Sequence, residues 1–180
     1  SESEKIEREI RKLIDDSRKN SERIRREIEK LIRDSEETSK EIKKEIEDLL
    51  RELKEMLDEI KKRDDDRLKE ELKKRADDVE RRIRELIKKN KDRLDEILER
   101  VERLVRENKE RLDKIEEDIR RKGVPEEVLR RAKKALEEDK KRNDEVLDEV
   151  RKALEEDKKR NDKVLEDARR VIKKIKDELK

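Results

Sequence analysis

The apolar residues of this chain recur at a spacing of eighteen, as Ile6, Ile24, Ile42 and Ile60 show in its first third. Eighteen residues complete about five α-helical turns at roughly 3.6 residues per turn. The repeat therefore returns each apolar side chain to the same face of the helix, whereas a seven-residue repeat would impose a left-handed supercoil. The spacing predicts long, nearly straight helices that each bury one face.

The same period runs through the rest of the chain. It appears in Val79, Ile97 and Ile115, and again in Val128, Val146 and Val164. The segment KALEEDKKRND even occurs twice without change, at residues 134–144 and 152–162. One Gly and one Pro among 180 residues leave little to interrupt a helix.

Two segments are predicted to be turns. Residues 61–67, KKRDDDR, hold no apolar residue, and the apolar faces before and after them are offset by about 100°, so one continuous helix would need a stripe that jumps sideways. A turn near residues 62–65 follows, with Asp65 or Asp66 as the N-cap of the next helix. In RRKGVPEEV, Gly123 suits the left-handed position after a helix and Pro125 suits the start of the next one.

These turns predict helices at about 1–62, 66–122 and 126–180, each about 57 residues long, in one domain that spans residues 1–180. Short loops make successive helices antiparallel. The expected fold is therefore all-α: an antiparallel up-down-up three-helix bundle. Each apolar stripe is about 120° wide, which suffices for two neighbouring helices, and no helix carries a second stripe. We therefore expect a monomer, with self-association or a fourth helix from a partner chain as the alternative.

Polar residues interrupt the apolar stripes at two levels. An antiparallel hairpin that turns near residue 63 places Asn108 level with Ser17–Ser21 and Asn90 level with Ser35–Ser39. A second hairpin that turns near residue 123 adds Asp139 to the first level and Asp157 to the second. The first level comprises Ser17, Asn20, Ser21, Asn108, Asp139 and Asn143, and the second comprises Ser35, Thr38, Ser39, Asn90, Asp157 and Asn161.

Each level predicts a buried network of hydrogen bonds between helices. Unpaired buried donors and acceptors cost about 1–3 kcal/mol each, so these side chains should satisfy one another. Such layers weaken a core but fix helix order and register, as a buried Asn does in coiled coils. On this interpretation, Asp157→Leu would leave Asn90 and Asn161 without partners and lower the melting temperature.

The alternative role for Asp139 and Asp157 is metal binding or acid–base catalysis. Metal sites in bundles draw several carboxylates, and often His, from facing helices, whereas each Asp here faces mainly Ser and Asn. The chain has no His and no Cys, so the usual base for nucleophilic catalysis is missing. The lone Gly123 cannot form a phosphate-binding loop. We expect no enzyme activity, no cofactor and no metal.

Charge and hydropathy point to no particular partner. Charged residues make up 64% of the chain, but both signs are interleaved and the net charge is only +2. Basic clusters are flanked by acidic residues, and there is no aromatic residue on which a nucleic-acid base could stack. The longest apolar run is two residues, which predicts no membrane span. We expect no required partner, no nucleic acid and no membrane, and the cellular location is not predicted.

Taken together, the whole-chain repeat of eighteen, the aliphatic core, the duplicated KALEEDKKRND, the matched polar levels and the GVPEE loop resemble de novo designed, parametrically generated helical bundles with buried hydrogen-bond networks. The resemblance covers essentially the whole chain. It implies a stable scaffold with no natural ligand, of a kind sometimes used as a building block for assemblies or for helix-release switches. Two functions therefore remain open from the sequence: an inert structural protein, or an assembly or binding module.

Overall fold

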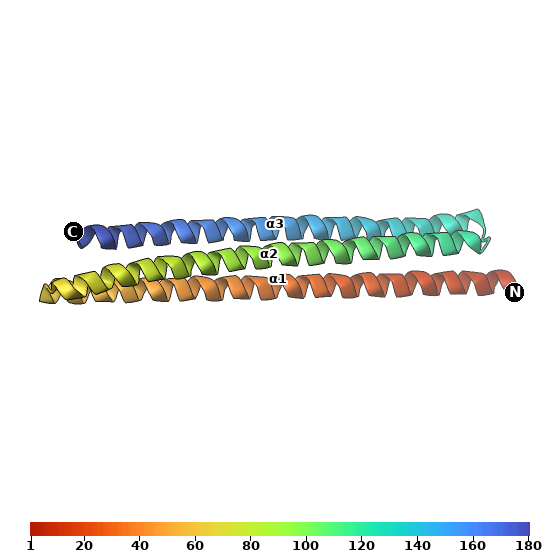
Figure 1. Ribbon diagram of the computed structural model, residues 1–180. Coiled ribbons are helices and arrows are strands. Elements are labelled where there is room, and N and C mark those ends of the chain that lie inside the picture. Colours follow the sequence, from red (N-terminus) through yellow and green to blue (C-terminus); the bar gives the residue numbers. More distant parts are fainter. The chain divides into compact units, whose positions relative to one another are not determined.

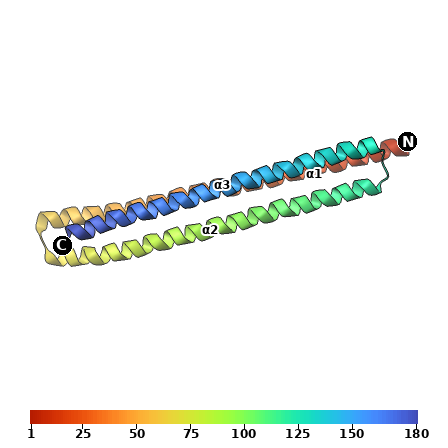
Figure 2. The same ribbon diagram turned by 90° about the horizontal axis from the view of Figure 1, so that it is seen from above.

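The computed structural model describes all residues from 1 to 180 and consists of three long α-helices that hold 95% of the chain (Figure 1). They are α1 (Glu2–Arg63), α2 (Asp66–Arg121) and α3 (Glu126–Glu178). The predicted helix bounds agree with these to within two residues. The chain reverses direction twice, so that α2 runs antiparallel to α1 and α3 (Figures 1 and 2). The predicted antiparallel three-helix fold is confirmed.

Contacts divide the chain into two compact units, and each unit contains a piece of all three helices. Unit 1 is made of residues 1–33 and 97–153, and unit 2 of residues 34–96 and 154–180. Each unit has an apolar core of its own, to which every helix contributes the face that carries the eighteen-residue repeat.

The core of unit 1 shows why the repeat matters. Ile10 and Ile28 lie one repeat apart on α1, and both are buried. Five full turns return both side chains to the same inward-facing position. The buried cluster near the start of α1 and the α2–α3 turn comprises Ile10, Leu112, Ile119, Ala132 and Leu136.

The core of unit 2 is larger, because the polar positions of the earlier repeats are replaced by Leu53, Met56 and Leu57 on α1. Leu53 and Leu72 are both completely buried, on α1 and α2 respectively. The buried cluster comprises Ile46, Leu53, Leu57, Ile60, Leu72, Ala76, Val79, Ile83, Leu86, Ile87, Ala168, Ile172, Ile175 and Leu179. No large apolar side chain is exposed anywhere in the chain, which follows from one apolar stripe per helix.

Ion pairs between α1 and α2 are consistent with the antiparallel register of these two helices. In unit 2 the Glu45 carboxylate lies 3.2 Å from the Arg82 guanidinium, and Glu52 lies 3.2 Å from Arg75. The residue number rises along α1 as it falls along α2, as antiparallel pairing requires. These pairs are largely solvent-exposed, so each contributes only about 0–1 kcal/mol to stability.

The α2–α3 turn has the residues that its geometry demands. Gly123 adopts φ of +65°, in the left-handed region that other residues enter only with strain. The N–H of Gly123 donates to the carbonyl of Arg120 at 3.4 Å, which closes α2. The carbonyl of Pro125 accepts the N–H of Leu129 at 3.1 Å. Pro125 is therefore the N-cap of α3, one residue before the first helical position at which the sequence placed it.

The α1–α2 turn consists of Asp64 and Asp65 alone. Asp64 adopts φ of +46°, the position that a Gly commonly takes after a helix. The carboxylate of Asp65 accepts the N–H of Arg67 at 2.9 Å, which identifies Asp65 as the N-cap of α2. Of the two caps considered from the sequence, the structure selects Asp65.

Candidate functional site

The candidate site consists of the polar residues on the apolar faces, and they form one layer in each unit. The first layer lies in unit 1 and the second in unit 2. Buried to more than nine-tenths are Ser17, Ser21, Asn108, Asp139 and Asn143 in the first layer and Ser35, Asn90, Asp157 and Asn161 in the second. Asn20, Thr38 and Ser39 are half-buried.

In the first layer, hydrogen bonds join α1 to α2. The amide nitrogen of Asn108 donates to the hydroxyl of Ser21 at 3.0 Å. The amide nitrogen of Asn20 donates to the carbonyl oxygen of the Asn108 side chain at 3.5 Å. The Asn108 side chain therefore has both a donor and an acceptor bond to α1, at the level expected from the sequence.

On α3, Asp139 makes no side-chain hydrogen bond in the first layer. Its carboxylate lies 3.7 Å from the guanidinium of Arg142, one turn further along the same helix. Burial raises the pKa of Asp139 above its ordinary value, and the positive charges of Arg142, Arg18 and Arg25 oppose this change. Burial thus outweighs the nearby guanidinium groups at Asp139, whose carboxylate has no direct donor from α1 or α2.

In the second layer, hydrogen bonds connect all three helices. The amide nitrogen of Asn90 on α2 donates to the hydroxyl of Ser39 on α1 at 3.1 Å. The same hydroxyl donates to the carboxylate of Asp157 on α3 at 2.7 Å. Ser39 is thus the central member of a chain from Asn90 to Asp157, and the guanidinium of Arg160 lies 3.7 Å from the other carboxylate oxygen of Asp157.

Arg93 belongs to the second layer, although the sequence did not identify it. Its guanidinium donates to the side-chain oxygen of Asn90 at 2.7 Å and to the backbone carbonyl of Ser35 at 3.0 Å. Burial lowers the pKa of Arg93, and the charge of Asp157 works against that change. The available signal was the spacing of three residues between Asn90 and Arg93, which places both on one helix face.

The two layers differ in their arginine contact, and one position on α1 accounts for this difference. In the first layer Asn20 donates a hydrogen bond to the side-chain oxygen of Asn108. Arg111, which lies one repeat from Arg93, makes no hydrogen bond to that oxygen. In the second layer the equivalent residue is Thr38, whose hydroxyl donates back to the carbonyl of Asp34 at 3.0 Å. The oxygen of Asn90 is thereby left for an arginine.

Several buried polar atoms have no partner. In the two layers they are the hydroxyls of Ser17 and Ser35 and the amide nitrogens of Asn143 and Asn161, at matching positions; outside the layers, one carboxylate oxygen of Glu116 also has no hydrogen-bond partner. The expectation that Asp157 bonds Asn90 and Asn161 is therefore wrong. Asn90 bonds Ser39 and Arg93 instead, and the amide nitrogen of Asn161, one turn beyond Asp157, has no acceptor at hydrogen-bond distance.

Ion pairs between α2 and α3 flank both layers. Beside the second layer, Lys91 pairs with Asp162 and Asp95 with Lys158. Beside the first layer, Lys109 pairs with Asp144, and Asp113 with Lys140, so the arrangement is repeated. The hydrogen bonds from Lys140 and Lys158 to their aspartates raise the pKa of both lysines.

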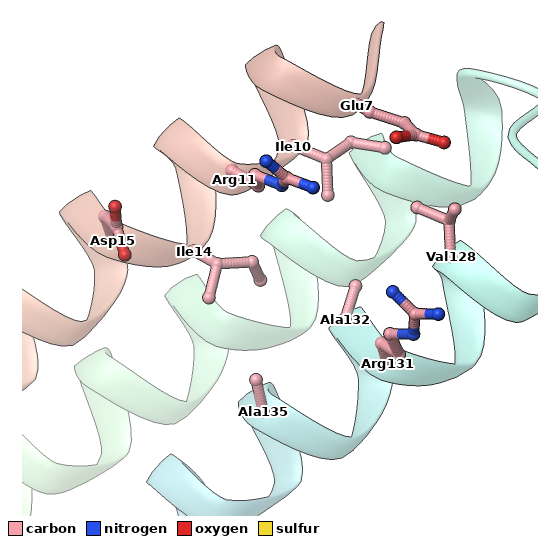
Figure 3. A pocket seen from close by; sticks show the side chains of 9 residues that line it. All are labelled: Glu7, Ile10, Arg11, Ile14, Asp15, Val128, Arg131, Ala132 and Ala135. Atoms are coloured by element: carbon pink, nitrogen blue, oxygen red, sulfur yellow. The ribbon is translucent and has the colours of Figure 1, made fainter. Parts of the chain in front are cut away.

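Two cavities lie in the grooves between α1 and α3, one in each unit. In unit 1 a cavity of about 270 Å³ has an apolar floor and a charged rim (Figure 3). Its lining comprises Glu7, Ile10, Arg11, Ile14, Asp15, Val128, Arg131, Ala132 and Ala135. In unit 2 a cavity of about 430 Å³ borders the second layer at Ser39, Asp157 and Asn161.

The only ion pair between α1 and α3 is Lys61–Glu178, at 3.0 Å.

Neither layer contains a group of three or more His, Cys, Asp or Glu side chains that could hold a metal ion. The functional groups that do converge are hydroxyls, amides, one carboxylate per layer and guanidinium groups. These groups can exchange hydrogen bonds and neutralise one another's charge. None of the helices is both long and apolar enough to cross a membrane.

Comparison with known proteins locates the fold. No protein-family model matches the chain, and no curated protein matches it either. A solved structure described as a "Computationally designed three helix bundle" is similar over 99% of this chain and 88% of its own, with a TM-score of 0.58 and 21% sequence identity. At that identity the likeness establishes the fold: a three-helix bundle.

Proposed function

We propose that this protein is a designed structural scaffold with no natural biochemical activity, whose purpose is its own fold as a monomeric three-helix bundle. The observation that carries this proposal is the eighteen-residue repeat, which governs the core, the polar layers and the ion pairs together. The similarity to a computationally designed three-helix bundle supports a designed origin. Catalysis, cofactors and required partners have no place in this function.

Within that scaffold the polar side chains that bond from one helix to another serve to fix helix order and register. Buried polar groups commonly lower stability relative to apolar ones, but they penalise arrangements in which they lose their partners. The chain of bonds from Asn90 through Ser39 to Asp157 supports this role, because it requires α1, α2 and α3 at one level simultaneously. Sliding any one helix by a turn would break a bond.

The monomer is tested by sedimentation velocity and light scattering at micromolar concentration. The expected mass is that of one chain, 22.1 kDa. A larger mass would favour the alternative function, an assembly or binding module. Strongly helical circular dichroism that persists to high temperature is expected for a packed bundle, and a broad transition at low temperature would contradict it.

The role of the polar layers is tested by an apolar variant of the second layer. We expect replacement of Ser35, Ser39, Asn90, Asp157 and Asn161 by Leu or Val to raise the guanidinium midpoint and to add species other than the monomer in sedimentation. A matched variant exchanges five exposed residues and should remain a single species. If the apolar variant also sediments as one monomer, the layers do not control register.

A further inference from the structure

The two turns of the chain differ in how firmly they keep their helices apart. The α2–α3 turn has Gly123, which adopts its φ of +65° without strain, and Pro125. Pro lacks an N–H and clashes with the preceding turn inside a helix, so α2 and α3 cannot merge into one regular helix. The α1–α2 turn has neither residue, and its φ of +46° falls on Asp64, an L-residue with a side chain.

Helical hydrogen bonding reaches almost to Asp64 from both sides. The N–H of Asp64 donates to the carbonyl of Ile60 at 2.8 Å, which continues the α1 pattern. The N–H of Lys69 donates to the carbonyl of Asp65 at 3.1 Å, which begins the α2 pattern. Only Asp64 and Asp65 separate the two helices, and every residue from 61 to 67 is able to adopt helical geometry.

A continuous α1–α2 helix would present two apolar stripes about 100° apart. One chain alone cannot bury both, because α1 would no longer lie beside α2. Two chains can, since α1 of each chain would pack on α2 and α3 of the other. Every contact of α1 is then remade between chains, including Glu45–Arg82, Glu52–Arg75 and the burial of Leu53.

We propose that the α1–α2 turn is a hinge through which two copies of this chain exchange α1 and form a dimer. The partner is a second copy, because only its α2 and α3 offer the contacts that α1 already makes. The hinge segments of the two chains are also complementary in charge. When they pair antiparallel, the basic residues 61–63 of one chain lie close to the acidic residues 64–66 of the other. Short hinge turns under strain favour this kind of exchange.

Concentration during folding decides which form is made. In dilute solution α1 folds onto its own chain, because the two-residue turn keeps its effective concentration high. At high concentration another chain competes. A folded monomer must detach all of α1 before it can exchange, so both forms persist once made.

The experiment unfolds the protein in guanidinium and refolds it at about 5 µM or about 1 mM, the latter comparable with the effective concentration across a short linker. Size-exclusion chromatography with light scattering should show a monomer of 22.1 kDa at the lower concentration and a dimer of twice that mass at the higher one. After isolation and dilution, the exchanged dimer should persist for hours. A dimer that separates within minutes would be a face-to-face contact and would overturn the exchange.

Two variants at one position sharpen the test. Asp64→Gly accepts positive φ without strain and disfavours the helix, whereas Asp64→Ala does the reverse. After both variants are refolded at the same concentration, the ratio of dimer concentration to the square of monomer concentration should be at least about a hundredfold lower for Asp64→Gly than for Asp64→Ala, because two hinges change per dimer. Gly123→Ala is the matched control and should give no additional dimer, since Pro125 keeps that turn closed.

Equal dimer fractions in the two Asp64 variants would show that the turn is not the hinge. A monomeric Asp64→Ala after refolding at about 1 mM, near the effective concentration of the native contact, would also refute the exchange. Far-UV circular dichroism of both variants provides the check on folding, which an exposed turn residue should not impair.

Discussion

Ser39 provides the sharpest test of the polar layers, because the chain offers the same substitution one turn away with the opposite expectation. The hydroxyl of Ser39 accepts a hydrogen bond from Asn90 and donates one to Asp157. The hydroxyl of Ser35 is more deeply buried but has no partner. Replacing each serine by alanine removes a hydroxyl in both cases, but only the Ser39 hydroxyl is hydrogen-bonded.

The expected magnitudes follow from the bonds that are lost. Ser39→Ala removes a hydrogen bond to a carboxylate, about 1.5–3 kcal/mol, and leaves the amide nitrogen of Asn90 without an acceptor, about 1 kcal/mol more. We expect a total loss of about 3 kcal/mol in the free energy of unfolding. Ser35→Ala removes an unpaired buried hydroxyl and should leave the stability unchanged or raise it by up to about 1 kcal/mol.

Ser21→Ala in the first layer should give an intermediate result. Ser21 accepts the bond from Asn108 but donates to no carboxylate, so its loss should cost about 1 kcal/mol. The predicted order of stability is therefore Ser35→Ala, then Ser21→Ala, then Ser39→Ala. This order depends only on the bonding pattern, because the chemical change is identical in all three variants.

Guanidinium unfolding followed by far-UV circular dichroism measures these differences, since the chain has no aromatic residue to report by fluorescence. With a denaturant dependence of about 6 kcal/mol/M, the loss of about 3 kcal/mol lowers the midpoint by about 0.5 M. Equal losses for Ser35→Ala and Ser39→Ala would refute the bonding pattern. So would a loss below about 0.5 kcal/mol for Ser39→Ala, because a buried carboxylate would then be indifferent to its donor.

Three further predictions concern individual side chains. The pKa of Asp139 is raised in the folded protein, so its contribution to stability is present below 3.8, the ordinary value for an aspartate, and is lost as the pH rises through the raised folded pKa. Over that pH range the unfolding free energy of the parent should fall relative to that of Asp139→Asn. A rise would contradict the burial effect. Gly123→Ala should lower stability by about 1 kcal/mol through its positive φ alone, since no atom lies within 4 Å of the added carbon, and thermal or guanidinium unfolding measures the change. Arg93→Ala should destabilise the protein by about 1 kcal/mol more than Arg111→Ala, because Arg93 bonds to the second layer, whereas Arg111 makes no such bonds at the equivalent place in the first. Equal effects of the two substitutions in guanidinium unfolding would show that the bonds of Arg93 contribute nothing.

The fold followed from the sequence because one simple pattern repeats in it. The offset of the apolar stripe located the turn at Asp64–Asp65, and Gly123 with Pro125 located the other, so helix order and direction were determined. Level matching also placed Asn108 beside Ser21 and Asn90 beside Ser39. These inferences need only the helical rise and the position of the turns.

The details of the polar layers did not follow, because level matching resolves one helical turn but not single atoms. Asn161 and Asp157 lie on one face, yet only Asp157 reaches a partner. Periodicity alone assigns Arg93 to the solvated face, although its long side chain extends to the carbonyl of Ser35. Whether it does so depends on Thr38, whose hydroxyl bonds its own backbone in preference to Asn90. Competition of this kind is decided by rotamers, which periodicity does not encode.

The ion pairs along α2 and α3 have a consequence for the size of this protein. Asp113–Lys140 and Asp95–Lys158 are the same contact, displaced by eighteen residues in opposite directions along the two helices. Removing eighteen residues from every helix would leave the surviving partners facing each other, and adding eighteen would supply one more identical set. Length is thus a free parameter of the molecule: a single interface chemistry specifies a whole series of proteins that differ only in how many times it is copied.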